Sequence, residues 1–395
     1  METKKLEEFL SRGVENIYPK KDFLKSKLDK REKLRIYAGI DPTGESLHLG
    51  HAMVFRKLAK LHEMGHTVIL LIGSFTAKIG DPTGKMSARV QLTDADIKKN
   101  MKSYIDQLSG ILDFNDKKNP IEVAYNDSWL APMSFADVVS LSSHFTVHQM
   151  LERDMFQERI KAEKPIFIHE FLYPLMQGSD SVALDVDMEI GGNDQTFNML
   201  AGRTLMKEMK EKEKIVMTLE LLTDAQGKKM SKTDNNFIAL TNSGNDMYGK
   251  IMSWPDEMIE KGFRMLTDVT SDEIAEMIKS IKKGANPRDV KMKLAYEVVR
   301  LYKSETDAKS AQENFTSVFS QGNKPTDIET IKVSSKDIIE VLVETKLATS
   351  KTDARKLLDQ KSVKVNDEVV AQGFVFKKGE SLVQKGKRHF IRVEV

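Results

Sequence analysis

The chain has 395 residues and no cysteine, and its 61 Lys and Arg nearly balance its 59 Asp and Glu. At roughly 100 to 200 residues per domain, this length predicts two or three domains. The absence of cysteine excludes disulfides, thiolate catalysis and cysteine-ligated zinc. The longest apolar run, VILLI at 68–72, is far shorter than the ~20 residues that span a bilayer, so no membrane span is predicted. The amino-terminal METKKLEEFL lacks the apolar centre of a secretory signal, which predicts a cytoplasmic protein.

The charge is unevenly distributed along the chain. Residues 331–395 hold 14 Lys and Arg against 9 Asp and Glu, whereas residues 1–330 hold 47 against 50. A basic carboxyl-terminal module on a slightly acidic body indicates a polyanionic partner bound at one end. A solubilising lysine surface explains the same numbers equally well, so charge alone does not decide between the two.

Predicted strands and helices alternate through the amino-terminal part of the chain. The predicted strands are residues 34–40, 67–75, 121–125 and 215–222, and the first two flank a helical stretch at 50–64. Capping boxes, in which Thr93 precedes Asp96 and Ser134 precedes Asp137, mark two further helix starts. Continuous apolar strands between helices favour an α/β fold with a parallel sheet, whose ligands bind at the carboxyl ends of its strands.

A helical region without predicted strands follows at 245–320. Helix starts are predicted at a capping box that begins at Thr270 and at Asn286, which precedes a proline. The polar stretch at 320–327 indicates a linker. Beyond it, residues 350–370 predict a short basic helix and then a hairpin with an Asn-Asp turn.

Two short motifs match other enzyme classes only in part. HEMGH at 62–66 fits the zinc peptidase pattern, which requires both histidines on one face of a continuing helix. Gly65 is predicted to end that helix, so zinc is a minor alternative that metal analysis of the purified protein tests. GDPTGKMS at 80–87 resembles a P-loop, but it has too few residues between its glycines, and Met86 stands where magnesium needs a hydroxyl.

The stretch GIDPTGESLHLGH at 39–51 joins the first predicted strand to the next helix. Its histidines, His48 and His51, lie on one side of the helix amino terminus, where backbone donors and the helix dipole attract anions. Gly50 between them has no Cβ, which lets a flat ring approach the backbone. A second cationic stretch, GKKMSKT at 227–233, follows the last predicted strand. Together the two stretches can hold one triphosphate from opposite sides.

The two cationic stretches resemble the paired ATP motifs of class I aminoacyl-tRNA synthetases. Four stretches, in order and spacing, resemble the tyrosyl-tRNA synthetase family. They are YAGIDPTGESLHLGH at 37–51, GDPTGK at 80–85, EFLYPLMQGSDSVAL at 170–184 and GGNDQ at 191–195. The likeness covers nearly the whole chain, and the tail is similar to the S4 RNA-binding module.

The resemblance implies four parts of the chain. They are a Rossmann-like catalytic domain at 1–225 with a connective region inserted at about 120–185, a KMSKT loop at 226–245, an α-helical domain on the anticodon side at 246–325, and a small α+β S4-like domain at 331–395.

A polar stripe among apolar residues indicates the amino-acid pocket. Tyr173, Gln177 and Asp180 follow at i, i+4 and i+7, which places them on one helical face. Pro174 inside that helix predicts a local kink or end. By the resemblance, Tyr37 and Asp180 bind the phenol of tyrosine, and Asp81, Tyr173 and Gln177 hold its ammonium group. Phenylalanine would leave the phenol-binding pair without a partner.

The other site residues are implied by the resemblance and surround the nucleotide. The ribose, the reacting carboxylate region and the adenylate are contacted by Asp194, Gln195, Gly39, Asp41, Gly50, Gly192, Met230 and Ser231. The phosphates are contacted by Thr43, His48, His51, Lys85, Arg89, Lys229, Lys232 and Thr233. No protein-held metal is implied, and Mg²⁺ enters with ATP.

The implied reaction has two steps. The tyrosine carboxylate attacks the α-phosphate of ATP, and a ribose hydroxyl at the 3′ end of tRNA(Tyr) then attacks the adenylate. No protein nucleophile is required, because positioning and charge stabilisation carry such catalysis. The family also implies a symmetric homodimer.

The sequence departs from the family pattern at a few positions near the pocket. Ser179 stands where an aromatic is common, Thr196 and Phe197 replace a frequent Trp-Gly, and VHQML at 147–151 differs from the usual Ala-Arg. These positions affect the expected pocket shape. Two alternatives remain: a tryptophan-specific relative, which would lack the phenol-binding pair and the S4-like tail, and an RNA-binding scaffold with decayed ATP motifs.

Overall fold

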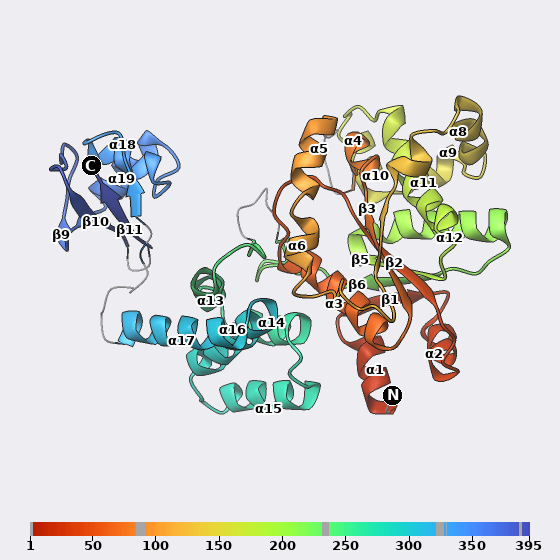
Figure 1. Cartoon of the computed structure of the whole chain (residues 1–395), viewed down its shortest axis with the longest axis horizontal. Helices are drawn as coiled ribbons and strands as arrows, with labels where there is room; N and C mark the ends of the chain where they lie inside the picture. The colour runs from red at the N-terminus through yellow and green to blue at the C-terminus, as the bar shows by residue number, and fades with distance from the viewer. Residues whose placement is uncertain (1–2, 84–91, 231–236, 321–327, 329, 387–388) are drawn as a thin grey trace. The chain divides into compact units, whose positions relative to one another are not determined.

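A computed structural model gives the structure of the chain (Figure 1). It describes all residues except 1–2, 84–91, 231–236, 321–327, 329 and 387–388. The chain divides into two compact units, residues 1–311 and 312–395, and each has its own sheet. The finer division into four parts stays a prediction.

A six-stranded sheet forms the centre of the first unit. Its order is β1-β6-β5-β2-β3-β4, and every neighbouring pair is parallel except β1 with β6. The strands are β1 (Val14–Tyr18), β2 (Arg35–Ile40), β3 (Thr67–Ile72), β4 (Glu122–Tyr125), β5 (Met188–Gly192) and β6 (Ile215–Leu219). The predicted parallel α/β sheet is confirmed. The antiparallel edge strand β1 was missed, because its exposed Glu15 and Asn16 interrupt the apolar pattern.

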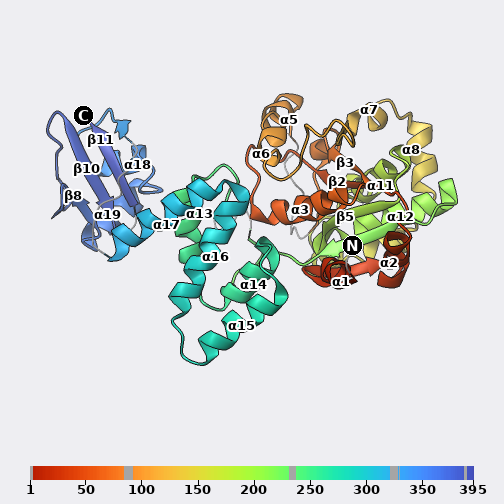
Figure 2. The same ribbon diagram turned by 60° about the horizontal axis from the view of Figure 1, so that its bottom comes forward.

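Helices cover the sheet and explain its apolar strands. β6 is buried along its whole length and β3 along all but its first residue. In both views the strands run between α3 on one side and α11 with α12 on the other (Figures 1 and 2). β2 lies between β5 and β3, so the chain order reverses there. The carboxyl ends of β2 and β5 therefore flank the position where open α/β sheets bind ligands.

Two strands end earlier than their apolar runs predict. β3 was predicted to reach residue 75 but ends at Ile72, and β6 was predicted to reach residue 222 but ends at Leu219. After β3 the chain passes through Gly73 into a turn at Ser74 and Phe75, and a Cβ on residue 73 would lie 1.9 Å from Asp41 Oδ1. Glycine at this position lets two chain segments approach at the carboxyl edge of the sheet.

Twelve described helices belong to the sheet domain, and some of them begin at side-chain caps. They are α1 (Thr3–Ser11), α2 (Lys21–Asp29), α3 (Leu49–Glu63), α4 (Thr76–Ile79), α5 (Asp94–Met101), α6 (Tyr104–Leu108), α7 (Asp127–Leu130), α8 (Phe135–Ser142), α9 (Val147–Leu151), α10 (Asp154–Lys161), α11 (Ile168–Ala183) and α12 (Thr196–Lys210), with a 3₁₀ turn at Asn193–Gln195. The predicted capping boxes at Thr93 and Ser134 are both formed.

Pro174 does not end its helix. α11 is 16 residues long and includes Pro174 in its interior, although proline removes one backbone hydrogen bond. The helix packs along α12, and Leu175, next to the proline, lies in a buried cluster with Leu205 of α12. Tertiary packing thus stabilises a helix that its local sequence would interrupt.

Five helices follow the sheet domain. They are α13 (Gly244–Met252), α14 (Met258–Leu266), α15 (Ser271–Lys282), α16 (Pro287–Tyr302) and α17 (Glu305–Ser320). The predicted capping box at Thr270 and the cap at Asn286 are both formed. Among the described residues, no helix is both long enough and apolar enough to cross a membrane.

The second unit is a small α+β module. Its sheet has the order β7-β11-β10-β8-β9, and its strands and helices are β7 (Thr330–Lys332), α18 (Ile338–Glu344), α19 (Lys351–Asp359), β8 (Val363–Val365), β9 (Glu368–Val369), β10 (Glu380–Lys385) and β11 (His389–Glu394). The predicted helix and hairpin are confirmed, and both turn residues, Asn366 and Asp367, have positive φ. The module has its own apolar core. The predicted linker at 320–327 lies almost entirely outside the described residues.

Candidate active site

The carboxyl ends of β2 and β5 bring predicted residues from distant parts of the sequence together. Asp41 follows β2, and the hydroxyl of Tyr173 on α11 donates a 2.8 Å hydrogen bond to its Oδ2. Asp194 lies just beyond β5, and its carboxylate pairs with Lys229 at 2.6 Å. Gly39 is exposed although its neighbours on β2 are buried, so the sheet is open to a ligand at this point.

Asp81, which lies just after α4, is a further carboxylate among the predicted site residues. Its Oδ2 accepts a 2.7 Å hydrogen bond from Gln195 Nε2, and its Oδ1 accepts one of 2.6 Å from Thr83. Arg153, a residue the sequence did not single out, donates to Thr83 Oγ1 at 2.8 Å and lies 3.9 Å from the Asp81 carboxylate. A ligand ammonium group would therefore meet a carboxylate that is already held in place.

The two predicted histidines form the start of α3. His48 is the capping residue, and its backbone N–H donates to His51 Nδ1 at 3.3 Å. The two imidazole rings stack with centroids 3.8 Å apart and an angle of 26° between their planes. Both rings thus lie on one side of the helix start, as their spacing predicts.

The segment after the lysine loop pairs with the HLGH segment. The backbone N–H of Leu49 donates to the carbonyl of Ile238 at 3.0 Å, and that of Leu240 donates to the carbonyl of Leu47 at 2.8 Å. Met230, inside the lysine loop, lines one small crevice with the start of α3. Met230 and the segment at 237–240, which flank residues outside the described part of the chain, therefore lie against the start of α3.

Several predicted contacts to phosphate and adenylate remain predictions. Five of these residues, Lys85, Arg89, Ser231, Lys232 and Thr233, lie outside the described residues. Thr43 is exposed, and Gly50 and Gly192 are half-buried close to the motifs just described.

The groups predicted to bind a phenol are buried in the unit. Tyr37 is fully buried, and its hydroxyl lies 3.0 Å from Ser181 Oγ. The Asp180 carboxylate is 2% exposed and accepts hydrogen bonds from Trp129 Nε1 at 2.9 Å and Asn126 Nδ2 at 3.3 Å. Burial raises the pKa of Tyr37 and of Asp180 well above their ordinary values. Tyr37 therefore keeps its proton and can donate it to a ligand oxygen.

Sequence reasoning missed most of the partners of these groups. They are Asn126, Trp129, Ser181, Glu189 and Lys214. Two signals could have found some of them. Glu189 is a charged residue inside an otherwise apolar strand, and Trp129 is one of only two tryptophans in the chain. The hydroxyl and amide residues carry no comparable local signal.

The zinc-like motif has another role. α3 ends at Glu63, and Gly65 has a φ of +90°, so the two histidines do not share a helical face. His62 Nε2 lies 2.6 Å from the carbonyl of Asn119, and His66 Nδ1 accepts from the N–H of Leu34 at 3.2 Å. Among the described residues, no group of three or more His, Cys, Asp or Glu is arranged to hold a metal.

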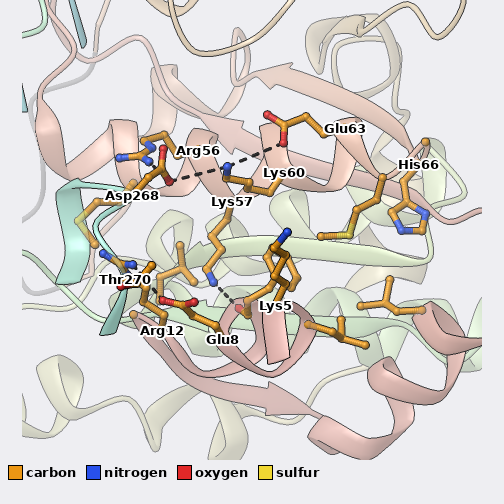
Figure 3. A pocket seen from close by; sticks show the side chains of 18 of the residues that line it. Lys5, Glu8, Arg12, Arg56, Lys57, Lys60, Glu63, His66, Asp268 and Thr270 are labelled. Carbon is orange, nitrogen blue, oxygen red and sulfur yellow. Dashed lines mark hydrogen bonds and ion pairs between the residues drawn. The ribbon is translucent and has the colours of Figure 1, made fainter. Parts of the chain in front are cut away.

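The structure also contains a cavity of about 1080 Å³ lined mainly by α1, α2 and α3 (Figure 3), and none of the described site residues lines it. Its cations already have partners. Arg12 donates to four carbonyl groups, and Arg56 and Lys60 lie 2.6 and 3.7 Å from Asp268. Lys57 donates to the carbonyl of Phe9, and burial lowers its pKa to about 7. These contacts join helices to one another, so we assign the cavity no ligand.

Comparisons with known proteins agree with this geometry. Residues 29–320 match the family model described as tRNA synthetases class I (W and Y). The tyrosine--tRNA ligase of Thermotoga maritima is 43% identical over 97% of this chain and 96% of its own, and that of Haemophilus ducreyi is 41% identical over 98% and 97%. A C-terminally truncated mitochondrial tyrosyl-tRNA synthetase of Aspergillus nidulans superposes with a TM-score of 0.67 at 26% identity, over 80% of this chain and 94% of that one. The chain therefore belongs to the class I tRNA synthetases for tryptophan and tyrosine, among the tyrosine--tRNA ligases.

Proposed function

We propose that the chain activates L-tyrosine with ATP and transfers it to the 3′ end of tRNA(Tyr). The substrate assignment rests on one observation. Tyr37 of β2 and Asp180 of α11 are both buried polar groups in the first unit. The Asp180 carboxylate is close enough to contribute to the raised pKa of Tyr37, after burial and Glu189. A phenol placed between them would accept from Tyr37 and donate to Asp180. Tryptophan has no phenol hydroxyl, so a tryptophan-specific relative does not need this pair.

The first step requires the tyrosine carboxylate to attack the α-phosphate of ATP. We assign the ammonium group to Asp81, Tyr173 and Gln177, the ribose to Asp194, and the carboxylate region to Gln195. We assign the phosphates to Thr43, the two histidines and the lysine loop, together with Lys85 and Arg89. These groups bind, orient and neutralise charge, so no side chain needs to form a covalent intermediate.

Mg²⁺ belongs to this scheme as part of the Mg-ATP substrate. Magnesium usually binds through substrate phosphates and waters with one or two carboxylates. Asp41 and Asp194 are the described carboxylates assigned here to the adenylate and the ribose, and Tyr173 and Lys229 hold them. ATP and tRNA as substrates accord with the predicted cytoplasmic location.

ATP–pyrophosphate exchange across the twenty amino acids tests the proposed function. Exchange should depend on tyrosine and should be far weaker with phenylalanine or tryptophan. Exchange driven by tryptophan would favour the tryptophan-specific alternative. If none of the twenty amino acids supports exchange, the result would favour the RNA-binding scaffold, whose ATP site has lost its activity.

The second unit is proposed to bind tRNA. Its residues 331–395 hold 14 Lys and Arg against 9 Asp and Glu, whereas the rest of the chain has no basic excess, and its own core supports an independent fold. Deleting residues 331–395 should leave tyrosine-dependent exchange unchanged and weaken tRNA charging, with a loss relative to the full chain that is largest at low salt and shrinks as salt rises, because salt screens the phosphate contacts of the full chain. Charging and exchange measured at two salt concentrations check this. Loss of exchange in the truncated protein would contradict the division of labour.

A homodimer is proposed from six exposed apolar residues in the region predicted as inserted, and we propose that they form one patch. The exposed residues are Phe135, Val139, Val147, Ile160, Phe167 and Ile168, with Phe135 84% and Ile168 80% exposed. Apolar groups gathered at a surface mark interaction sites, and a two-fold interface can bury one patch against its copy.

Phe135→Asp should convert the dimer to a monomer, because a carboxylate would lose its water in the interface. Sedimentation velocity or light scattering measures the mass. Val369→Asp is the control, since Val369 is also an exposed apolar residue but belongs to the second unit. A wild-type monomer, or dissociation by both variants, would contradict the assignment of this patch.

A further inference from the structure

A buried ion pair lies beneath the proposed tyrosine pocket. The side chains of Lys214, which precedes β6, and Glu189 of β5 are 0% and 3% exposed and contact each other directly. The Lys214 ammonium also donates to Ser181 Oγ at 2.7 Å and to the carbonyl of Met199 at 3.2 Å. An ammonium group has three protons, and each has an acceptor here.

Glu189 connects this pair to the ammonium end of the pocket. Its Oε1 accepts a 3.0 Å hydrogen bond from Gln177 Nε2. An ionised carboxylate only accepts, so the amide NH₂ of Gln177 must face Glu189. The amide oxygen of Gln177 is then the group left to accept from a ligand ammonium. Glu189 thereby fixes which end of the amide faces the ligand.

Lys214 connects the same pair to the phenol end. Because an ammonium group only donates, Ser181 Oγ accepts from Lys214, and the same oxygen lies 3.0 Å from the Tyr37 hydroxyl. The ammonium also lies 5.6 Å from the centroid of the Tyr37 ring. Lys214 therefore contacts Tyr37 from the ring side and, through one hydroxyl, from the oxygen side.

The absence of a side chain at Gly202 leaves room for the ammonium group of Lys214. A Cβ on Gly202 of α12 would lie 2.5 Å from Lys214 Nζ and 2.7 Å from Ser181 Oγ. Burying two charges costs several kcal/mol each, and well-packed apolar residues often give equal stability. A contribution to stability therefore does not explain a buried charge pair at this place. The orientation of two pocket residues explains it directly.

We propose that Lys214 and Glu189 are positioning residues that orient Tyr37 and Gln177 together and so set the selectivity of the pocket for tyrosine. This inference rests on the proposed function, because it concerns the pocket assigned to tyrosine. Neither residue touches the ligand in this scheme. Their effect is on tyrosine binding and on its distinction from phenylalanine, and not on the ATP site.

The double variant Glu189→Gln with Lys214→Met tests the proposal. It removes both charges at nearly constant volume, so neither is left buried without its partner. The KM for tyrosine should rise about 10-fold to 100-fold, and the preference for tyrosine over phenylalanine should fall, because two pocket groups lose their fixed orientation. The KM for ATP should stay unchanged and kcat should change less than the KM for tyrosine.

A matched control pair lies next to Lys214. Arg203 of α12 and Glu213, the residue before Lys214, form a partly exposed pair at 2.5 Å. The double variant Arg203→Met with Glu213→Gln also removes one positive and one negative charge and should leave both KM values unchanged. Ser181→Ala is the second test, because it cuts only the link to Tyr37 and should lower selectivity against phenylalanine without raising the KM for ATP.

The outcomes separate the two proposals. If the wild type shows no tyrosine-dependent exchange, the proposed function fails. If the wild type is active and the folded Glu189 and Lys214 double variant keeps its KM for tyrosine and its selectivity, the positioning role is overturned. If thermal unfolding shows that this double variant does not fold, Ser181→Ala decides, and unchanged selectivity in that variant overturns the proposal.

Discussion

Replacing Asp180 by asparagine is expected to raise the KM for tyrosine about 10-fold to 100-fold, because the amide NH₂ cannot accept a hydrogen bond and leaves a buried donor without its partner, which costs about 1 to 3 kcal/mol. Asparagine keeps the shape of the side chain, so the volume of the pocket stays nearly constant. Asp180 is hydrogen-bonded to Trp129 and Asn126, and neither is a predicted nucleotide contact. The KM for ATP should therefore change little. Exchange kinetics with each substrate varied in turn measure both values.

Asp185→Asn is the control for this variant. Asp185 lies just beyond the same helix with a φ of 48°, which asparagine adopts readily, and its side chain is 65% exposed. It should leave both KM values unchanged. An equal rise in the KM for tyrosine and for ATP in Asp180→Asn would contradict the phenol-binding role.

The stability of Asp180→Asn relative to the wild type is expected to increase with pH. Burial raises the pKa of Asp180 well above its ordinary value of 3.8. Between these two pKa values the folded chain keeps a proton that the unfolded chain has lost, so this group makes the wild type less stable as pH rises. Asparagine has no such proton. The unfolding temperature of Asp180→Asn minus that of the wild type should rise from about pH 4 upward, and a fall in this signed difference would contradict the buried carboxyl.

The second large effect is expected from Arg12→Met. The Arg12 guanidinium donates to the carbonyls of Phe263, Arg264, Thr267 and Val269, at or just beyond the end of α14. Methionine keeps much of the apolar stem but leaves these acceptors without their donor. The free energy of unfolding should fall by about 2 to 4 kcal/mol, since each buried acceptor that loses its partner costs about 1 to 3 kcal/mol and water replaces some of the bonds.

Urea unfolding followed by tryptophan fluorescence measures this loss. The chain has two tryptophans, Trp129 and Trp254, and both lie in the first unit, so the signal reports that unit alone. Lys4→Met is the control, because Lys4 lies in α1, the helix that Arg12 directly follows, and its ion pair with Asp272 is exposed. It should not shift the transition measurably. An equal shift in both variants would mean that Arg12 contributes no more than a surface charge.

Sequence signals that act over a few residues predicted their structures correctly. The capping boxes at Thr93, Ser134 and Thr270 are formed, and the Asn-Asp turn joins the predicted hairpin. In each case the interacting groups lie within about four residues, so the chain carries the whole interaction locally. The apolar period likewise predicted the central parallel strands, because burial on both faces requires continuous apolar residues.

The sequence predicted which side chains gather at the candidate site much better than it predicted which residues hold them there. The spacing of His48 and His51 predicted that both rings share one side of a helix start, and Met230 and residues 237–240, on either side of the undescribed part of the lysine loop, lie against that start. Their recognition came from a resemblance over nearly the whole chain. Neither composition nor period indicated that Asp180 is held by Trp129 and Asn126, because those contacts join residues about 50 positions apart.

By itself the sequence determined the fold class, the order of the main elements, the local caps and the two cationic motifs. Only the tertiary structure decided that α11 continues through Pro174, that β1 pairs antiparallel at the sheet edge, and that Lys214 and Glu189 meet under Tyr37. The physical reason is the same in each case. These features depend on packing and on charge neutralisation between segments that are far apart in the chain, and such energies exist only once the fold has brought the segments together.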